Sequence, residues 1–185
     1  MKETSDEDIL NLLLQEHTYQ KGFSLLMVKY REQLYRHIRR IVIIHDDADD
    51  VIQNTFIKVY KSIDRFEGKS KLYTWLYRIA TNEAITFINS KNKKETADID
   101  DPDQAYLGAS LKADEWFDGD DIQLRLQKAI ITLPDKQRIV FNMRYFEETP
   151  YEEMSKILDT SVGALKASYH HAVKKVEAYF SEKDE

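Results

Sequence analysis

The sequence predicts an all-α protein built from two small helical domains joined by an acidic linker. Apolar residues recur at spacings of three and four along most of the chain, which is the period of an amphipathic helix. No segment alternates apolar and polar residues convincingly with the period of two that marks a β-strand. Only five glycines and three prolines interrupt the 185 residues, so long helices with few turns are expected.

Four periodic segments form the N-terminal domain, which is predicted to span residues 1–92. Their expected bounds are Ser5–Glu16, Phe23–Ile44, Ala48–Ile63 and Leu72–Ser90. In chain order, the residues expected to face inward are Ile9, Leu12 and Leu13, then Leu26, Tyr30, Leu34, Ile38 and Ile41, then Ile52, Phe56, Val59, Tyr60 and Ile63, then Leu72, Trp75, Leu76, Ile79, Ala80 and Phe87.

Residues 93–121 are predicted to be a linker. Ten acidic residues and a single lysine lie between positions 95 and 121, so this stretch carries a charge of −9 in a chain whose total is −6. The remaining chain is therefore net positive. A loop inside one domain is the alternative, but structureless loops of roughly 30 residues are uncommon in compact domains. Trp116 and Phe117 stand out in this acidic stretch, and we expect them to dock on either domain or in a partner's groove.

The C-terminal domain, residues 122–185, is predicted to contain four helices. The first two have apolar stripes, and Pro134 separates them. The last two, Thr149–Leu158 and Val162–Phe180, are joined by a turn of a few residues. The residues expected to form the buried stripes of the first two are Leu126, Ala129, Ile130 and Leu133, followed by Ile139, Val140 and Met143.

The starts of the two final helices carry capping signals. Thr149 and Glu152 form a capping box with Pro150 at the first helical position, and Ser161 is the N-cap candidate of the last helix. The last helix places its apolar residues on one face: Val162, Leu165, Tyr169, Ala172, Val176 and Tyr179.

The opposite face of this last helix is small near its start and cationic toward its end. No acidic residue occurs between Ser161 and Val176. A short helix, a tight turn and a longer helix of this kind suit the major groove of DNA. An amphipathic hairpin with solvated lysines is the alternative. The residues expected at the DNA are Ser161, Ala164, Lys166, Ala167, Ser168, His170, His171, Lys174 and Lys175.

Composition excludes several other classes of protein. Without cysteine, the chain has no disulfide, thiolate metal site or cysteine nucleophile. No apolar run approaches the ~20 residues that span a bilayer, so we expect a soluble, cytoplasmic protein. Neither a phosphate-binding glycine loop, a zinc-protease motif nor a nucleophile elbow is present, and no enzyme activity or cofactor is expected. The acids around His45 lack ligand spacing, so no metal site is predicted.

Three stretches in register resemble the extracytoplasmic-function sigma factors of bacterial RNA polymerase. Asp49–Tyr60 is similar to the family's polymerase-docking helix, and Arg65–Gly68 followed by Leu72–Asn82 is similar to its strand-opening segment. Leu133–Phe141 resembles the entry to the domain that binds the promoter −35 element. The resemblance covers both domains in order and omits only the linker.

The resemblance implies a sigma factor that binds core RNA polymerase and directs it to specific promoters. It also implies an anti-sigma partner, often membrane-anchored, without membrane insertion of this chain itself. By spacing alone, the acids near residue 47 merely begin a helix, where negative charge is favourable, and Trp75 is more typical of core than of DNA contact. The residues implied for polymerase docking are Asp47, Asp50, Gln53 and Asn54; those implied for the −10 region are Lys69, Ser70, Lys71, Tyr73, Arg78 and Asn82.

Two features leave alternatives open. Ser168 and His171 stand where arginine is frequent in the family, and Ala164 replaces a common threonine, so the promoter preference does not carry over from the resemblance. A polymerase-independent helix-turn-helix regulator would use the same C-terminal helices. Such proteins generally need a dimer interface or a sensing domain, and the N-terminal domain shows no ligand-pocket signature.

Overall fold

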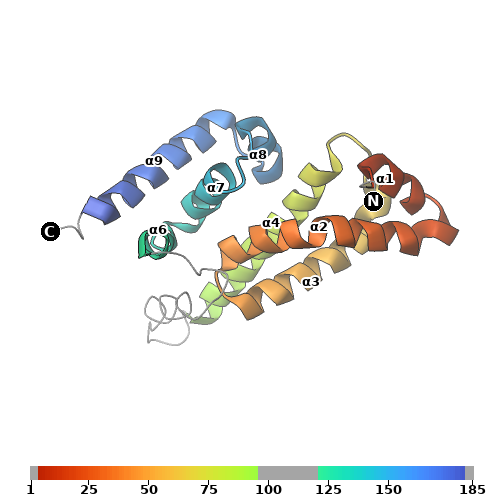
Figure 1. Cartoon of the computed structure of the whole chain (residues 1–185), viewed down its shortest axis with the longest axis horizontal. Helices are drawn as coiled ribbons and strands as arrows, with labels where there is room; N and C mark the ends of the chain where they lie inside the picture. Colours follow the sequence, from red (N-terminus) through yellow and green to blue (C-terminus); the bar gives the residue numbers. More distant parts are fainter. Residues whose placement is uncertain (1–3, 96–120, 182–185) are drawn as a thin grey trace. The chain divides into compact units, whose positions relative to one another are not determined.

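The computed structural model describes residues 4–95 and 121–181, and throughout these two ranges the regular structure is helical, without a strand (Figure 1). This confirms the all-α prediction. The chain divides into two compact units, Met1–Phe87 and Ile88–Glu185, each with its own internal packing. Helix α4 runs across the boundary between them. Trp116 and Phe117 lie outside the described residues.

The N-terminal unit contains four α-helices within its described residues, joined by short turns. Compared with the sequence prediction, the first helix ends earlier, the second begins earlier, and the fourth runs five residues further. The bounds are α1, Asp6–Leu13; α2, Tyr19–Val42; α3, His45–Ser62; and α4, Leu72–Glu95, with 3₁₀ turns at Glu16–Thr18 and Ile63–Arg65.

The core of this unit forms along the predicted stripe of α2, all five residues of which are buried: Leu26, Tyr30, Leu34, Ile38 and Ile41. One prediction is wrong. Tyr60 of α3 remains 48 % exposed, because its ring meets Tyr19 and Phe23 only edge-on, at centroid distances of 5.2 and 5.0 Å. Four other residues that were expected to face inward are only half-buried: Leu12, Trp75, Ile79 and Phe87.

A polar contact within the core joins α2 to α4. The Nε2 atom of His37 lies 2.8 Å from the Oγ1 atom of Thr81, and that hydroxyl donates to the Tyr77 carbonyl at 2.7 Å. His37 and Thr81 are both fully buried, so each satisfies a polar group that would otherwise be costly to bury. At the surface, Lys58 of α3 pairs with Glu83 of α4.

The link between α2 and α3 is tight. Ile43 has a φ of 72°, and the Ile44 N–H donates to the Val42 carbonyl at 2.9 Å, so the chain reverses through a strained γ-turn. Burial of the Ile43 side chain supplies apolar contacts that offset this strain.

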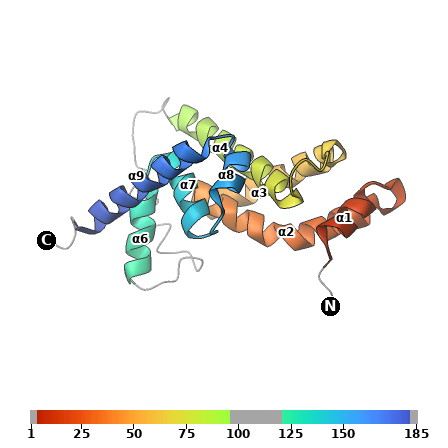
Figure 2. The same ribbon diagram turned by 90° about the horizontal axis from the view of Figure 1, so that it is seen from above.

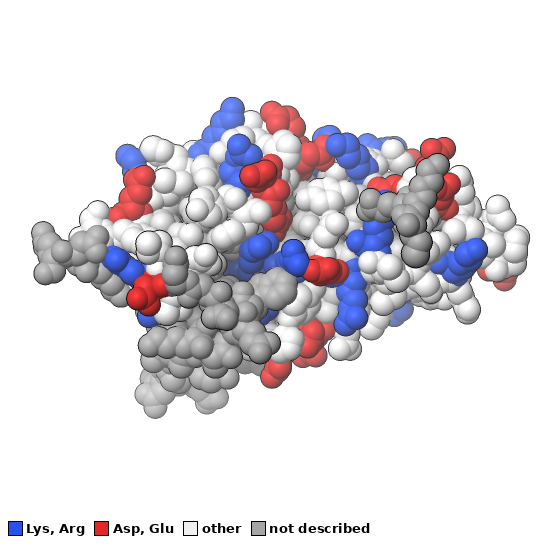
Figure 3. Space-filling view, viewed as in Figure 1, with Lys and Arg blue, Asp and Glu red and all other residues white. Residues whose placement is uncertain are grey.

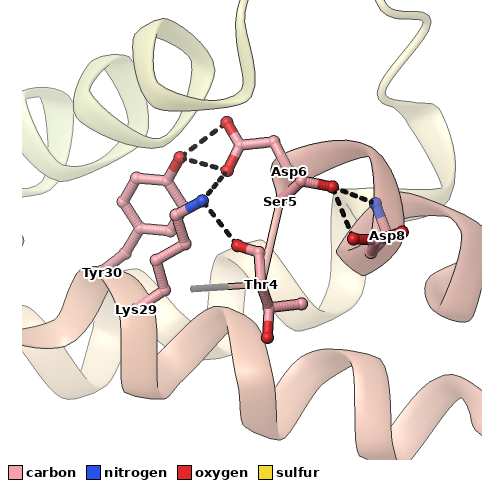
Figure 4. A network of polar contacts seen from close by, with 6 residues as sticks. All are labelled: Thr4, Ser5, Asp6, Asp8, Lys29 and Tyr30. Carbon is pink, nitrogen blue, oxygen red and sulfur yellow. Dashed lines mark hydrogen bonds and ion pairs between the residues drawn. The ribbon is translucent and has the colours of Figure 1, made fainter. Parts of the chain in front are cut away.

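Helix α1 is joined to α2 by polar contacts of Asp6 with Lys29 and Tyr30, here called the clasp (Figure 4). The Tyr30 hydroxyl lies 2.8 Å from both carboxylate oxygens of Asp6. Lys29 reaches the same carboxylate at 2.8 Å and donates to the Thr4 carbonyl at 2.9 Å. Ser5 is the N-cap of α1, and its hydroxyl accepts the Asp8 N–H. One carboxylate therefore connects the first helix to the second.

The C-terminal unit is a four-helix bundle over its described residues, as predicted. Its core is buried between the first, second and last of these helices, where Phe141 and Ala172 meet Ile130 and Leu133. The last helix packs against each of the other three. Figure 2 shows the same helices from above. The bounds are α6, Asp121–Ile131; α7, Asp135–Tyr145; α8, Tyr151–Leu158; and α9, Val162–Ser181.

We expect Asp6→Ala to loosen α1 by about 1–2 kcal/mol, because it leaves the partly buried Tyr30 hydroxyl and Lys29 without their shared acceptor. Hydrogen exchange of the α1 amides is expected to accelerate, while the exchange of α3 core amides stays unchanged. Glu7→Ala is the matched control, since it also removes one acid from the first helical turn. Equal acceleration in both variants would show that the clasp contributes nothing.

Candidate nucleic-acid and partner interfaces

The turn between α8 and α9 is defined by its backbone. Asp159 adopts the left-handed conformation, with a φ of 49°, and its N–H donates to the Ser155 carbonyl. The Ser161 hydroxyl then accepts the Ala164 N–H at 3.3 Å, and its carbonyl accepts the Leu165 N–H at 3.0 Å. The predicted N-cap of the last helix is thus confirmed.

The predicted start of α8 is wrong by one position. Pro150 has an extended ψ of 145° and serves as the N-cap, so it is not the first helical residue. Thr149 makes no capping bond: its N–H donates to the Met143 carbonyl, and its buried Oγ1 has no hydrogen-bond partner within the described part of the chain. The fold of the preceding loop, which buries Thr149, overrides the local capping signal.

Packing of α9 separates its two faces. Leu165, Ala172 and Val176 are buried, and Tyr169 is half-buried against the core. The residues predicted to meet DNA lie on the other side; Ser168 is half-buried, and the rest of the set is exposed: Ser161, Ala164, Lys166, Ala167, His170, His171, Lys174 and Lys175. The structure therefore places the predicted −35 set on α9 and on Ser161, the N-cap that precedes it.

Tyrosines and cations converge where α7, α8 and α9 meet. The Tyr151 ring lies 5.4 Å from the Arg144 guanidinium carbon and 5.7 Å from the Lys166 Nζ. Burial raises the pKa of Tyr169, the nearby Tyr151 and Tyr145 hydroxyls raise it further, and Arg144 opposes the shift. Two phenols and a guanidinium therefore contribute to the electrostatics around Tyr169. Sequence reasoning found Lys166 but missed Arg144 and Tyr151.

The predicted strand-opening residues follow α3 as a loop and the start of α4. Gly68 has a φ of 70°, a conformation that glycine adopts without strain. Lys69 pairs with Glu67 in the same loop, Ser70 is half-buried, and Lys71 is exposed. The loop therefore presents two lysines at the surface.

The first two turns of α4 carry an aromatic platform. Tyr73 lies against Tyr77, with ring centroids 4.1 Å apart and an interplanar angle of 34°. Trp75 is half-buried and contacts Phe66 of the loop at 5.4 Å. Arg78 and Asn82 lie one and two turns further along α4 and are exposed. Aromatic faces, a cation and an amide are thus available to unstacked bases.

The predicted docking residues lie on α3. Asp50, Gln53 and Asn54 are exposed and Asp47 is half-buried. Beside Gln53, α2 and α3 enclose a groove of about 540 Å³ with a mostly apolar lining. The groove is lined by Phe23, Met27, Arg31, Asp49, Ile52, Gln53, Phe56, Ile57, Tyr60 and Lys61. Sequence reasoning missed this groove. Its signal was Ile57 and Tyr60, two large apolar residues spaced by three.

Charges on the described surface are mixed. On the face drawn in Figure 3, lysine and arginine side chains are interspersed with acidic ones and with uncharged surface. His45 and Asp49 approach to 3.7 Å on α3. In residues 4–95 and 121–181 no cluster of three or more acidic or histidine side chains is arranged to hold a metal ion, and no helix there has the length and apolar character needed to cross a membrane.

Two family models match the chain in the order of its two units. Sigma-70 region 2 matches residues 26–94, and Sigma-70, region 4 matches residues 123–176. The chain is 31% identical over 160 residues to the ECF RNA polymerase sigma-E factor of Escherichia coli (strain K12), covering 83% of each chain. It belongs to the sigma-70 family, as an extracytoplasmic-function sigma factor. The corresponding protein of Haemophilus influenzae is 29% identical over 164 residues, covering 85% of this chain and 86% of the relative.

Solved structures share the fold. The sigma factor RpoE of Bartonella quintana, crystallised with the anti-sigma factor NepR, superposes with a TM-score of 0.68 at 21% identity, covering 87% of this chain and 98% of that one. CnrH, in complex with the cytosolic domain of CnrY, gives 0.66 at 19% identity, covering 96% and 99%. In this sigma factor, region 2 spans α2–α4 and region 4 spans most of α6–α9.

The left-handed residue between α8 and α9 gives a direct test of the turn. Asp159→Val is expected to destabilise the C-terminal unit by about 1–2 kcal/mol, because a β-branched side chain is disfavoured at positive φ. Asp159→Gly relieves the same constraint and is expected to be neutral or slightly stabilising. Thermal unfolding followed by circular dichroism measures both variants. A similar loss of stability in the glycine variant would mean that the Asp159 side chain, rather than its backbone conformation, holds the turn.

Proposed function

We propose that this sigma factor recognises the promoter −35 element through the outer face of α9. The observation that carries this proposal is the division of α9 into an apolar face, buried in the core, and an opposite face of small and basic residues. Small residues near the start of the helix allow base edges to approach. Lys174 and Lys175, nearer its end, supply phosphate contacts that fix position without specifying sequence.

The −10 region is assigned to the N-terminal unit. Tyr73 supplies a stacking surface, Lys71 and Arg78 supply phosphate contacts, and Asn82 reads an unstacked base. Lys69 and Ser70 complete the loop that receives that base. Support comes from the exposure of Lys71, Arg78 and Asn82 around the Tyr73–Tyr77 pair.

Docking to the largest subunit of core RNA polymerase is assigned to α3, through Asp47, Asp50, Gln53 and Asn54. The apolar groove beside Gln53 extends this surface toward α2. An anti-sigma partner, like the one in the solved structure of RpoE, would hold the protein inactive by covering the same surface. On this account residues 1–92 and 122–185 act as separate domains, and the protein works in the cytoplasm as a regulator without enzyme activity of its own.

The free energies of duplex opening and of base stacking explain why the protein needs polymerase. Opening a duplex costs about 1.4 kcal/mol per base-pair step, while stacking of a base on an aromatic side chain returns about 1–3 kcal/mol. Capture of a few bases therefore roughly balances the opening of the same number of steps. The additional free energy has to come from contacts that polymerase makes with DNA and with this protein.

Docking is tested by the affinity of the whole chain for core RNA polymerase. Asp50→Ala combined with Gln53→Ala, and separately Ile57→Glu in the groove, are each expected to weaken binding by at least about tenfold, since central interface residues dominate binding energy. Gln33→Ala, an exposed change elsewhere on α2, is the control and should bind as the unaltered chain does. Wild-type binding by both docking variants would place the polymerase contact elsewhere.

The −35 contacts are tested by salt dependence. Removal of one lysine that binds a phosphate is expected to reduce the slope of log affinity against log salt by about one. Lys174→Gln with Lys175→Gln should therefore reduce the slope of promoter binding by about two in the polymerase-bound protein. Lys136→Gln removes an exposed charge from α7 and should leave the slope unchanged. A slope reduction of about one by Lys136→Gln, which is half the expected effect of the double substitution, would mean that only overall charge matters.

A further inference from the structure

The contact between Tyr151 and two cations has no role in the fold described above. Tyr151 is the first residue of α8 and is half-buried. Its ring lies within cation–π range of Arg144 from α7 and of Lys166 from α9. One aromatic side chain on the first helix of the pair therefore touches a charged side chain on the second.

The far side of this cluster is anchored to the backbone. The Nη1 atom of Arg144 donates to the Glu148 carbonyl at 3.3 Å and approaches the Thr149 carbonyl at 3.5 Å. Both carbonyls belong to the loop that leads directly into Tyr151. Arg144 thereby ties the ring to α7, so the position of the ring is set by the bundle and not by Lys166.

Among the described residues, Lys166, unlike Arg144, is not anchored to the backbone of the bundle. It is exposed, and within residues 4–95 and 121–181 the structure gives it no carboxylate partner. A lysine side chain has many rotamers and loses much conformational entropy when it is held in one of them. Contact with a fixed ring reduces this freedom before DNA arrives. Unlike a salt bridge, the ring contact leaves the charge of the ammonium group unneutralised and its three N–H donors available.

We propose that Tyr151 is a positioning residue for promoter binding: its ring holds the Lys166 ammonium in the orientation in which it meets the DNA backbone. This inference rests on the proposed role of α9. The ligand is a phosphate of the duplex next to the bases that the small residues Ala164 and Ala167 approach. A phosphate contact carries no sequence information itself, but it fixes the register of α9 on the duplex. Through Lys166, Tyr151 therefore affects which bases α9 meets without touching a base.

The geometry is tested first by proton NMR of the whole chain. In the unaltered protein and in Tyr151→Phe, the side-chain methylenes of Lys166 are expected to show upfield ring-current shifts. In Tyr151→Leu those shifts should disappear. Lys166 shifts that are the same in all three proteins would overturn the proposal. Thermal unfolding of each variant confirms that the fold is retained, and the phenylalanine variant keeps the test valid if leucine destabilises the unit.

Function is tested by the affinity of the polymerase-bound protein for a −35 duplex. Tyr151→Leu should weaken binding about two- to fivefold, the range expected of an exposed cation–π contact, and Tyr151→Phe should retain wild-type affinity. In a Lys166→Met background the leucine substitution should cost less than half as much. Equal reductions in affinity in both backgrounds, or equal reductions from phenylalanine and leucine, would contradict positioning through the ring.

The experiments distinguish two failures: that α9 does not bind the −35 element, and that only the positioning role of Tyr151 is wrong. If α9 does not meet the −35 duplex, then Lys174→Gln with Lys175→Gln also leaves affinity unchanged, whereas failure of positioning alone leaves the effect of those two substitutions intact. The NMR shifts report the contact in either case.

Discussion

The burial of one narrow stripe of α9 is the constraint on which the C-terminal unit depends. Leu165, Ala172 and Val176 are buried in α9, which packs against three other helices, and their burial fixes the rotation of α9 about its own axis. Because residues three and four apart share a helix face, fixing the buried stripe also fixes which side chains face outward. The small and basic outer face is therefore a consequence of core packing.

The N-terminal unit, in contrast, leaves large apolar side chains exposed at its surface. There the core is complete along α2, α3 and α4, yet apolar surface remains outside it: Val28 is 83 % exposed, Ile57 50 % and Tyr60 48 %. Ile57 and Tyr60 also line the groove between α2 and α3, and contiguous exposed apolar surface of this kind is typical of an interaction site. A sigma factor needs such a surface because its activity depends on polymerase. The core of this unit therefore leaves Ile57 and Tyr60 exposed at the groove.

Periodicity predicted the helices well because long amphipathic helices carry many repeats of the same signal. All five stripe residues of α2 proved buried. Shorter signals were less reliable. The capping box at Thr149 does not form because the preceding loop buries that residue. The period wrongly predicts a buried Tyr60, because the α2 rings of Tyr19 and Phe23 meet the Tyr60 ring only edge-on. Local patterns do not report how closely the side chains of a neighbouring helix cover a residue.

The candidate sites also differ in how far the sequence alone predicts them. The outer face of α9 follows from the spacing of its own residues. The groove between α2 and α3 combines residues more than twenty positions apart, and the contact of Tyr151 with Arg144 and Lys166 joins three helices. Both arise from tertiary packing, which a single sequence does not encode in any local period.

Promoter opening measured with purified components tests the central claim most directly. The unaltered chain, core RNA polymerase and a cognate promoter would be combined, and strand opening near −10 followed by the reactivity of unpaired thymines. The account predicts opening only when both proteins are present, together with weak, salt-sensitive binding by the chain alone. Tight, salt-resistant promoter binding by the chain without polymerase, with no opening when polymerase is added, would contradict it.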